Sequence, residues 1–246
     1  MNQILINNSL IPIYIMKKLF IILIITGLTL PVTAQILPFL EKGKSGASIN
    51  IGSEMGYGFN GFIAGAGVSI NSVIDVEASY FRTNFDKQKL GLTGTSPSSD
   101  YVEAHFTLWL LKSRLAPYLD LYVGANPVVF NSNYHGYEYP DGTNTATFIG
   151  NTGGALGLVS NLVFRTNNNW LFMPFYRVHY MFSKDRIEKN LVETSETSNS
   201  CGVSYGISLG KMLGKMGTVY LSLKAYDNTN NSRAFHDITL GYVVPF

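Results

Sequence analysis

Histidine and carboxylate side chains are the groups in this sequence best suited to chemistry. Glu103 precedes His105 by two residues, and Arg177 precedes His179 by the same spacing. In a β-strand a spacing of two puts both side chains on one face. A carboxylate or a cation held beside an imidazole can position a proton or bind a ligand. If these pairs face an enclosed space, they either line a narrow hydrated pore or fill it with ion pairs.

His236 and Asp237 form a second candidate, because an Asp–His pair can activate water. Consecutive residues of a strand point to opposite faces, so these two cannot form one dyad without a bulge. We therefore favour an interfacial position for His236 over a catalytic one. His135 has only Glu138 nearby, whereas a metal site needs three or four ligands. Residues 206–212 lack the spacing of a phosphate loop. We expect no metal and no cofactor.

The elements that would position these side chains alternate with a period of two. The pattern is clearest at the C-terminus, where every second side chain from 238 to 246 is apolar and those between them are mostly small or polar. The two sets point to opposite faces of a strand. The apolar set is Ile238, Leu240, Tyr242, Val244 and Phe246.

Ten segments of this kind can be counted after residue 45. They cover residues 46–57, 61–70, 73–82, 101–110, 117–126, 147–165, 170–182, 200–210, 218–226 and 234–246. Most have about the 9–11 residues that a tilted strand needs to cross a bilayer. The sixth is too long and contains the glycine-rich residues 151–154, where we expect a bulge or a projection beyond the membrane.

The connections between these segments alternate in length. Long polar connections are expected at 83–100, 127–146 and 183–199, with a shorter one at 227–233, and short turns lie between them. Long loops on one side and short turns on the other are typical of outer-membrane barrels. The sequence thus predicts a closed antiparallel up-and-down transmembrane β-barrel over residues 46–246, with about ten strands and with eight or twelve as alternatives.

Composition indicates which surroundings the two faces have. Of 246 residues, 46% are hydrophobic and only 14% are charged, and the formal net charge is +2. So many apolar residues exclude a disordered chain, a single cysteine excludes a disulfide scaffold, and the small charge gives no reason to expect nucleic acid. A soluble β-domain would carry more Lys and Glu on its outer face. The apolar face is therefore expected to touch lipid, and a sheet in lipid must close.

The opposite face is polar and is expected to line the lumen. Its charged and histidine residues are Glu54, Asp75, Glu77, Glu103, His105, Asp120, Arg177, His179, Lys224 and Asp237. Acids and bases both occur, so we expect them to neutralise one another, with Lys224 and Asp237 as cross-strand partners. We favour an ion-paired filling over a ligand site, because side chains nearly fill barrels of this size.

The N-terminus predicts export. Lys17 and Lys18 precede an apolar run at 19–30, and residues 32–34 form a small-x-small site, so residues 1–34 are expected to be a signal peptide cleaved between Ala34 and Gln35. Residues 1–15 precede a second methionine, Met16, at which translation could instead begin. Residues 35–45 are expected to form a short periplasmic segment, and a plug formed by residues 36–41 is the alternative.

Together, the signal sequence, the alternating segments and the aromatic C-terminal strand resemble the small outer-membrane β-barrel proteins of Gram-negative bacteria. The Asn-rich loops resemble those of porin-family barrels of Bacteroidota. The resemblance implies surroundings of outer-membrane lipid and lipopolysaccharide. It also implies that the barrel assembly machinery reads the terminal pattern of Ile238, Leu240, Tyr242, Val244 and Phe246.

For function, the sequence favours a non-enzymatic barrel: either a narrow porin-like conduit or a structural or adhesive barrel that displays its outer loops. The alternative is a barrel-embedded hydrolase, similar to a lipid A deacylase or a protease. A soluble ligand-binding barrel ranks third.

Overall fold

The computed structural model describes residues 39–40, 43–90, 97–136, 138–139, 146–189, 192–228 and 231–246. The predicted signal peptide, with Ala34 and Gln35 at its end, lies outside these ranges. No helix in the described part of the chain is long and apolar enough to cross a membrane.

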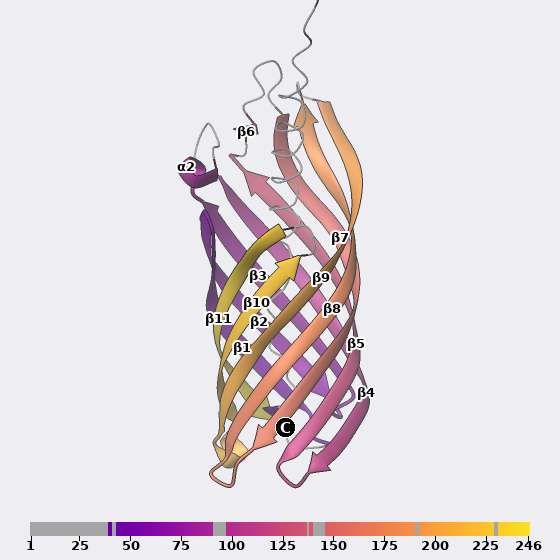
Figure 1. Cartoon of the computed structure of the whole chain (residues 1–246), viewed down its shortest axis with the longest axis vertical. Helices are drawn as coiled ribbons and strands as arrows, with labels where there is room; N and C mark the ends of the chain where they lie inside the picture. The colour runs from indigo at the N-terminus through magenta and orange to yellow at the C-terminus, as the bar shows by residue number, and fades with distance from the viewer. Residues whose placement is uncertain are drawn as a thin grey trace, which may run out of the picture.

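Nearly all the described residues belong to β-strands (Figure 1). In chain order the elements are β1 (Gly46–Gly56), β2 (Phe59–Ile70), β3 (Ile74–Phe85), α2 (Lys87–Leu90), β4 (Ser98–Ala116), β5 (Leu119–His135), β6 (Glu138–Tyr139), β7 (Ala146–Arg165), β8 (Trp170–Lys189), β9 (Val192–Met212), the 3-10 helix η2 (Gly214–Met216), β10 (Thr218–Asn228) and β11 (Asn231–Pro245).

The long strands form one closed antiparallel barrel. Neighbours in the sheet are consecutive in the chain, β5 pairs with β7, and the first strand β1 pairs with the last strand β11. The two-residue strand β6 is a small addition to the edge of β7. The predicted fold class and the count of ten barrel strands are therefore confirmed.

The two ends of the barrel differ in their longest connections: the upper end has those at 86–97 and 136–145, although three pairs of strands, β1–β2, β8–β9 and β10–β11, are joined there by two residues. At the lower end in Figure 1, which also holds the C-terminus, the connections are short and two of them use left-handed residues, Asn71 with Ser72 (φ 50° and 53°) and Asn169 (φ 62°). Positive φ at consecutive turn residues matches the twist of a hairpin, and Asn tolerates it. We call this the short-turn end, and the opposite end the hairpin end.

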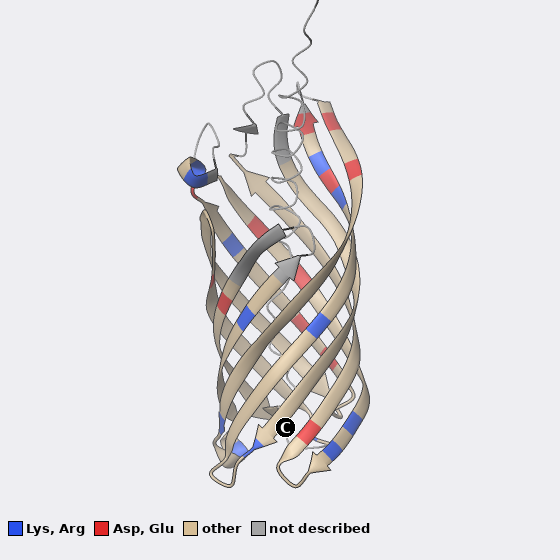
Figure 2. Cartoon of the chain, viewed as in Figure 1, with Lys and Arg blue, Asp and Glu red and all other residues tan. Residues whose placement is uncertain are grey.

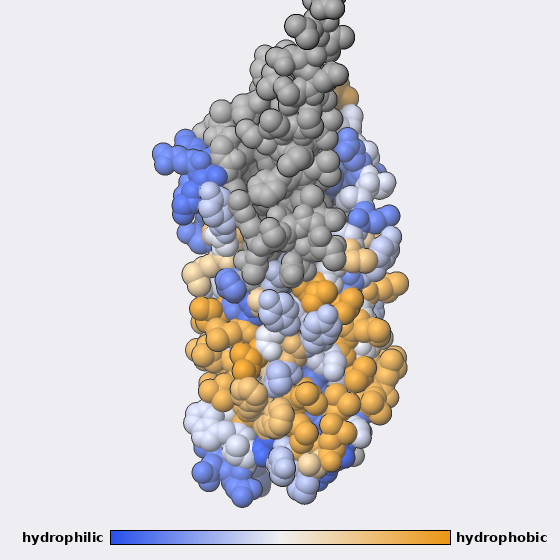
Figure 3. All heavy atoms as spheres, in the orientation of Figure 1, coloured by the Kyte–Doolittle hydropathy of each residue, from blue (hydrophilic) through white to orange (hydrophobic). Residues whose placement is uncertain are grey.

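Side chains alternate between the outside and the inside of the barrel, as a period of two requires. Leu156 and Leu158 of β7 are 64% and 61% exposed, while Ala155 and Val159 beside them are buried. The exposed apolar residues gather in a band around the visible face of the barrel, with polar residues on either side of it (Figure 3).

The hairpin end differs most from the sequence-based expectation. Residues 183–199 were predicted to be a long loop, but β8 and β9 remain paired up to Lys189 and Val192. The strand β10 ends at Asn228, opposite Gly202, so the end of the β8–β9 hairpin continues well beyond its neighbour. A loop was predicted because the outer part of the hairpin lacks the apolar face by which the other strands were recognised. That prediction was wrong, since the Thr residues of this part still favour a strand. The register shift in β7 falls at Phe148/Gly150, just before residues 151–154.

Inside the barrel, apolar side chains form two clusters. The lower cluster lies toward the short-turn end and joins Phe39, Leu40, Trp109, Tyr122, Val159, Val163, Leu171, Met173, Tyr220 and Val243. The upper cluster lies toward the hairpin end and joins Ile63, Phe81, Tyr101, Val128, Phe130, Ala155 and Met181.

The ring of Tyr220 in the lower cluster lies over Gly241 of β11, where an added Cβ would overlap it. Tyr220 is 1% exposed, so its ring has little freedom to move away. We expect Gly241→Ala to lower the free energy of unfolding by about 1–3 kcal/mol through overpacking. Urea unfolding of the refolded protein, followed by tryptophan fluorescence, measures this loss.

Tyr220→Ala provides the control, because it removes the ring that the new methyl group would meet. The double variant should be no less stable than Tyr220→Ala alone. Additive losses would contradict the proposed contact.

Candidate functional site

Nine of the ten side chains predicted to face the lumen lie inside the barrel with at most 7% of their surface exposed. They come from six strands: Glu54 from β1, Asp75 and Glu77 from β3, Glu103 and His105 from β4, Arg177 and His179 from β8, Lys224 from β10 and Asp237 from β11. The tenth, Asp120, is half-buried near the short-turn end, where Arg114 and Arg165 donate to its carboxylate at 3.4 and 3.2 Å.

The two histidine pairs, which are 72 residues apart in the chain, meet through one contact across the lumen. Arg177 Nη1 of β8 lies 3.5 Å from His105 Nδ1 of β4, and these strands are separated in the sheet by β5 and β7. His105 Nε2 lies 3.2 Å from Glu103 Oε1 on its own strand. Asn126 of β5 completes this group, because its Oδ1 is 3.4 Å from His105 Nδ1. The result is a polar layer through the middle of the lumen.

Lys224 and Asp237 are directly opposite each other in the β10–β11 register, as predicted, with Nζ and Oδ2 3.7 Å apart. Glu54 is opposite Asp237 on the other side of β11 and accepts a hydrogen bond from Thr83 Oγ1. This second group therefore places one ammonium beside two carboxyl groups.

Several partners of these residues were not singled out from the sequence. Trp109 Nε1 donates to Asp75 Oδ2 at 3.1 Å, and the ring of Tyr226 stacks on His179 with centroids 5.7 Å apart. Asn126 Nδ2 donates to Thr107 Oγ1 at 2.9 Å. The sequence did carry a signal that could have identified these partners, because each of them occupies an inward-facing position in the alternation of its strand.

The nine buried residues include more acidic than basic side chains. They comprise five carboxylic acids, two histidines, Arg177 and Lys224. A lumen with this composition favours cations over anions.

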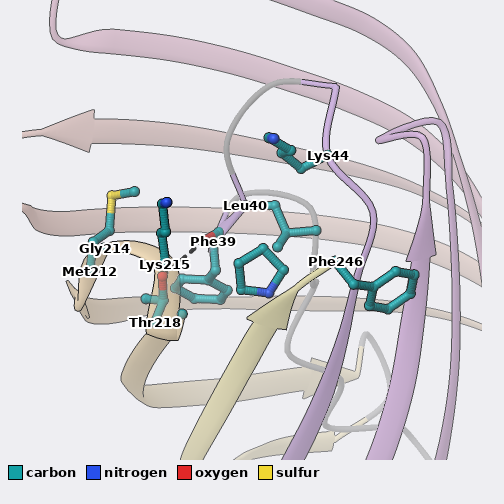
Figure 4. Close-up of a pocket in the computed structure, with 10 residues that line it drawn as sticks. Phe39, Leu40, Lys44, Met212, Gly214, Lys215, Thr218 and Phe246 are labelled. Atoms are coloured by element: carbon teal, nitrogen blue, oxygen red, sulfur yellow. Dashed lines mark hydrogen bonds between the residues drawn. The ribbon is translucent and has the colours of Figure 1, made fainter.

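Phe39 and Leu40, which precede β1 in the chain, lie in the short-turn end of the lumen (Figure 4). Phe39 and Leu40 are each 2% exposed, and the ring of Phe39 stacks on Tyr220 at 4.3 Å. Thr218 Oγ1 donates to the Phe39 carbonyl at 3.0 Å, and Arg165 Nη2 donates to the Leu40 carbonyl at 3.5 Å. Residues 35–45 were expected to form a short periplasmic segment, with a plug at residues 36–41 as the alternative, and the packing of Phe39 and Leu40 into the barrel agrees with the alternative.

Two glycines make room for this segment. A Cβ at Gly46 would meet the Leu40 side chain, and one at Gly210 would lie 3.3 Å from the Phe39 ring. A cavity of about 400 Å³ remains beside the segment, with Lys44, Lys215 and Phe246 among its lining residues (Figure 4). We call Phe39 and Leu40 the plug.

The other histidines do not join the layer. His236 is exposed while the neighbouring Asp237 is buried, so the two face opposite sides, as the strand geometry predicted. His135 Nε2 lies 3.1 Å from Asp100 Oδ2 on the outer surface. Among the described residues, no three His, Cys, Asp or Glu side chains are grouped so that they could hold a metal ion.

Comparison with known proteins identifies the fold of the chain. No protein-family model matches the chain, and no curated protein sequence does. Among solved structures, the translocator domain of the autotransporter NalP from Neisseria meningitidis aligns with a TM-score of 0.51 and 8% identity, covering 84% of this chain and 90% of that one. At this identity the likeness extends to the fold only.

Two further barrels align less well. The outer membrane protease OmpT from Escherichia coli has a TM-score of 0.40 and 12% identity, with 82% of this chain and 95% of that chain covered. The attachment invasion locus protein Ail of Yersinia pestis has a TM-score of 0.34 and 12% identity, with 82% and 99% covered.

The Lys224–Asp237 pair yields a stability prediction. Lys224→Met leaves the Asp237 carboxyl group buried without its ammonium partner, so we expect the free energy of unfolding to fall by about 3–5 kcal/mol. Urea unfolding followed by tryptophan fluorescence measures the change. Lys224→Met/Asp237→Asn should recover most of the loss, and Lys184→Met on the exposed outer face should change little. A double variant as unstable as Lys224→Met would refute the pairing.

Asp185, on the projecting part of β8, yields a pH prediction. Burial raises its pKa to about 6 despite the hydrogen bond that Asn151 Nδ2 donates at 2.5 Å, and Glu196 adds to the rise. The folded state therefore holds this proton more tightly than the unfolded state, so hairpin stability should fall as pH rises from about 4 to about 6.

Hydrogen-exchange protection factors across 183–199, corrected for intrinsic rates, should show this fall. Asp185→Asn should remove most of this pH dependence of the protection factors. Asp86→Asn, outside the hairpin, should leave the pH dependence unchanged. Protection that rises over the same interval would contradict the sign.

Proposed function

We propose that the chain is an outer-membrane β-barrel, closed at its periplasmic end, that acts non-enzymatically by displaying a polar β-sheet outside the cell. The observation that carries the proposal is the β8–β9 hairpin. It remains paired to Lys189 and Val192, while the adjacent strand β10 ends opposite Gly202. All the residues of β9 from 192 to 197 are exposed, and only Val192 is apolar.

The apolar band supports the membrane location. On β8 the outward rings run from Trp170 and Phe172 to Tyr180 and Phe182, all between 41% and 48% exposed. From Phe172 to Phe182 the strand rises about 33 Å, which is about 25 Å along the axis of a barrel with strands tilted by about 40°. That height matches the lipid-facing band of outer-membrane barrels, and the rings match its two aromatic girdles.

The connections support the orientation. In outer-membrane barrels short turns lie in the periplasm and longer segments lie outside. The short-turn end, with the plug and the C-terminus, is then periplasmic, and the β8–β9 hairpin is external. The outward side chains of Ile238, Leu240, Val244 and Phe246 are 38–75% exposed, and that of Tyr242 is half-buried. A barrel assembly machine could read this face during insertion.

The plug and the lower cluster favour display over conduction. The lower cluster draws side chains from β4, β5, β7, β8, β10 and β11 around Phe39 and Leu40. Such a cluster excludes water and ions from the short-turn end. A conduit is the second candidate, favoured by the excess of carboxyl groups in the polar layer, and it would be selective for cations.

The test combines location with conductance. The wild-type protein should fractionate with outer membranes, migrate differently on gels before and after heating, and show no stepwise conductance in planar bilayers. Phe39→Asp/Leu40→Asp should expel the plug from its apolar site and produce cation-selective steps. Adding Glu103→Gln should reduce that selectivity.

Met216→Asp introduces an acid at the same end, at a residue that is 66% exposed, and is the matched control. It should not conduct. Stepwise conductance of the wild-type protein would establish the conduit instead, and absence from the membrane fraction would refute both.

A further inference from the structure

Two cations lie on the outward face of β8 just beyond the aromatic girdle at the hairpin end. Lys184 and Arg186 continue the outward set of side chains that includes Tyr180 and Phe182. Lys184 is two residues beyond Phe182, which is about 7 Å along the strand. Charged headgroups begin directly outside the hydrocarbon region that an aromatic girdle marks. The two cations therefore lie at headgroup height in the proposed orientation.

The surface around these cations is hollowed. A cavity of about 250 Å³ is lined by Thr152 of β7, Lys184 and Arg186 of β8, and Glu193, Thr194 and Ser195 of β9. In the sheet register, Thr152 and Thr197 flank Lys184, and Gly150 and Ser195 flank Arg186. Hydroxyl groups beside an ammonium and a guanidinium are suitable donors for phosphate oxygens.

Arg186 is held in place by Asn133 of β5. Its Nη2 donates to Asn133 Oδ1 at 2.8 Å, while its Nε has no acceptor among the described residues. Gly150 permits this position, because a Cβ there would collide with the guanidinium group. An anion at the cavity would find a cation that is already oriented.

Another outward arginine near this height, Arg82, is satisfied within the protein. Arg82 Nη1 donates to both oxygens of Asp100, at 2.9 and 2.8 Å, and Tyr80 and His135 contact the same carboxylate. Burial alone would raise the pKa of Asp100, but the hydrogen bonds from Tyr80 and Arg82 outweigh it and lower the pKa. In the described part of the chain, Lys184 has no ion-pair partner of this kind. Figure 2 shows charged residues of both signs on the projecting part of the β8–β9 hairpin.

We propose that Lys184 and Arg186 bind a phosphate group on the sugar headgroup of an outer-leaflet lipid. Glu193 lies farther from the girdle than Arg186, at the outer edge of the cavity, where its carboxylate accepts hydrogen bonds from sugar hydroxyls. The inference rests on the proposed outer-membrane location, because only that location brings such a headgroup to the site.

The test uses the full refolded protein and bisphosphorylated lipid A as the probe, with bound lipid counted by native mass spectrometry. Removing two cations from a headgroup site should weaken lipid retention about thirtyfold, so we expect this loss in Lys184→Gln/Arg186→Gln. Lys87→Gln/Lys89→Gln removes the same charge from α2, at the same end of the barrel, and should retain lipid as the wild type does.

Two further arms identify what is recognised. Dephosphorylated lipid A should bind the wild type as weakly as phosphorylated lipid A binds the Lys184→Gln/Arg186→Gln variant, and millimolar inorganic phosphate should not displace lipid A. Equal losses in the two double variants, or equal retention of both lipids, would overturn the site. Displacement by inorganic phosphate would assign it to free phosphate instead. A wild type that fractionates with outer membranes but fails these arms overturns only this inference, since fractionation tests the proposed function separately.

Discussion

Pairing of the first strand with the last is the interaction on which the rest of the structure depends. The β1–β11 ladder runs from Gly46 opposite Pro245 to Met55 opposite His236, and it leaves the sheet no open edge along the apolar band. An unpaired backbone N–H or C=O in hydrocarbon costs several kcal/mol, so a sheet with an apolar outer face is stable in lipid only when it closes. Once closure is required, every strand has one face toward lipid and one toward a narrow interior.

That interior is built in layers with different chemistry. Apolar clusters lie toward the two ends, and a polar layer crosses the middle, where Arg177 of β8 reaches His105 of β4. Charged side chains in so narrow a space need partners, which explains why the layer also recruits Thr83, Asn126 and Tyr226. The plug adds to the apolar cluster at the short-turn end, because Phe39 stacks on Tyr220 and extends the apolar packing into the mouth of the barrel.

Outside the apolar band, strand edges are no longer in lipid and need not all be paired. The strands of the barrel therefore end at different heights there. The β8–β9 hairpin continues as a two-sided polar ribbon, while the β10–β11 hairpin ends earlier. The cavity beside Lys184 and Arg186 lies where the lipid-facing wall gives way to this ribbon. The proposed display of a polar sheet and the proposed binding of a lipid headgroup thus both depend on the point at which β8 and β9 leave the membrane.

The sequence alone determined the period of two, the count of ten barrel strands and the inward parity of the charged residues, because strand geometry is local and each segment carries its own pattern. It also identified Lys224 and Asp237 as partners, since they belong to one hairpin. It did not determine the contact between His105 and Arg177, the entry of Phe39 and Leu40 into the mouth, or the length of the β8–β9 hairpin.

The first two of these depend on how the strands are staggered when the sheet closes, which brings together residues that no local pattern relates. The length of the β8–β9 hairpin was missed because its strands stay paired beyond the lipid. Outside the lipid a strand needs no apolar face, so the alternation by which strands were recognised is absent there. Local periodicity therefore defined the walls of the barrel, and only closure in three dimensions decided what meets inside it.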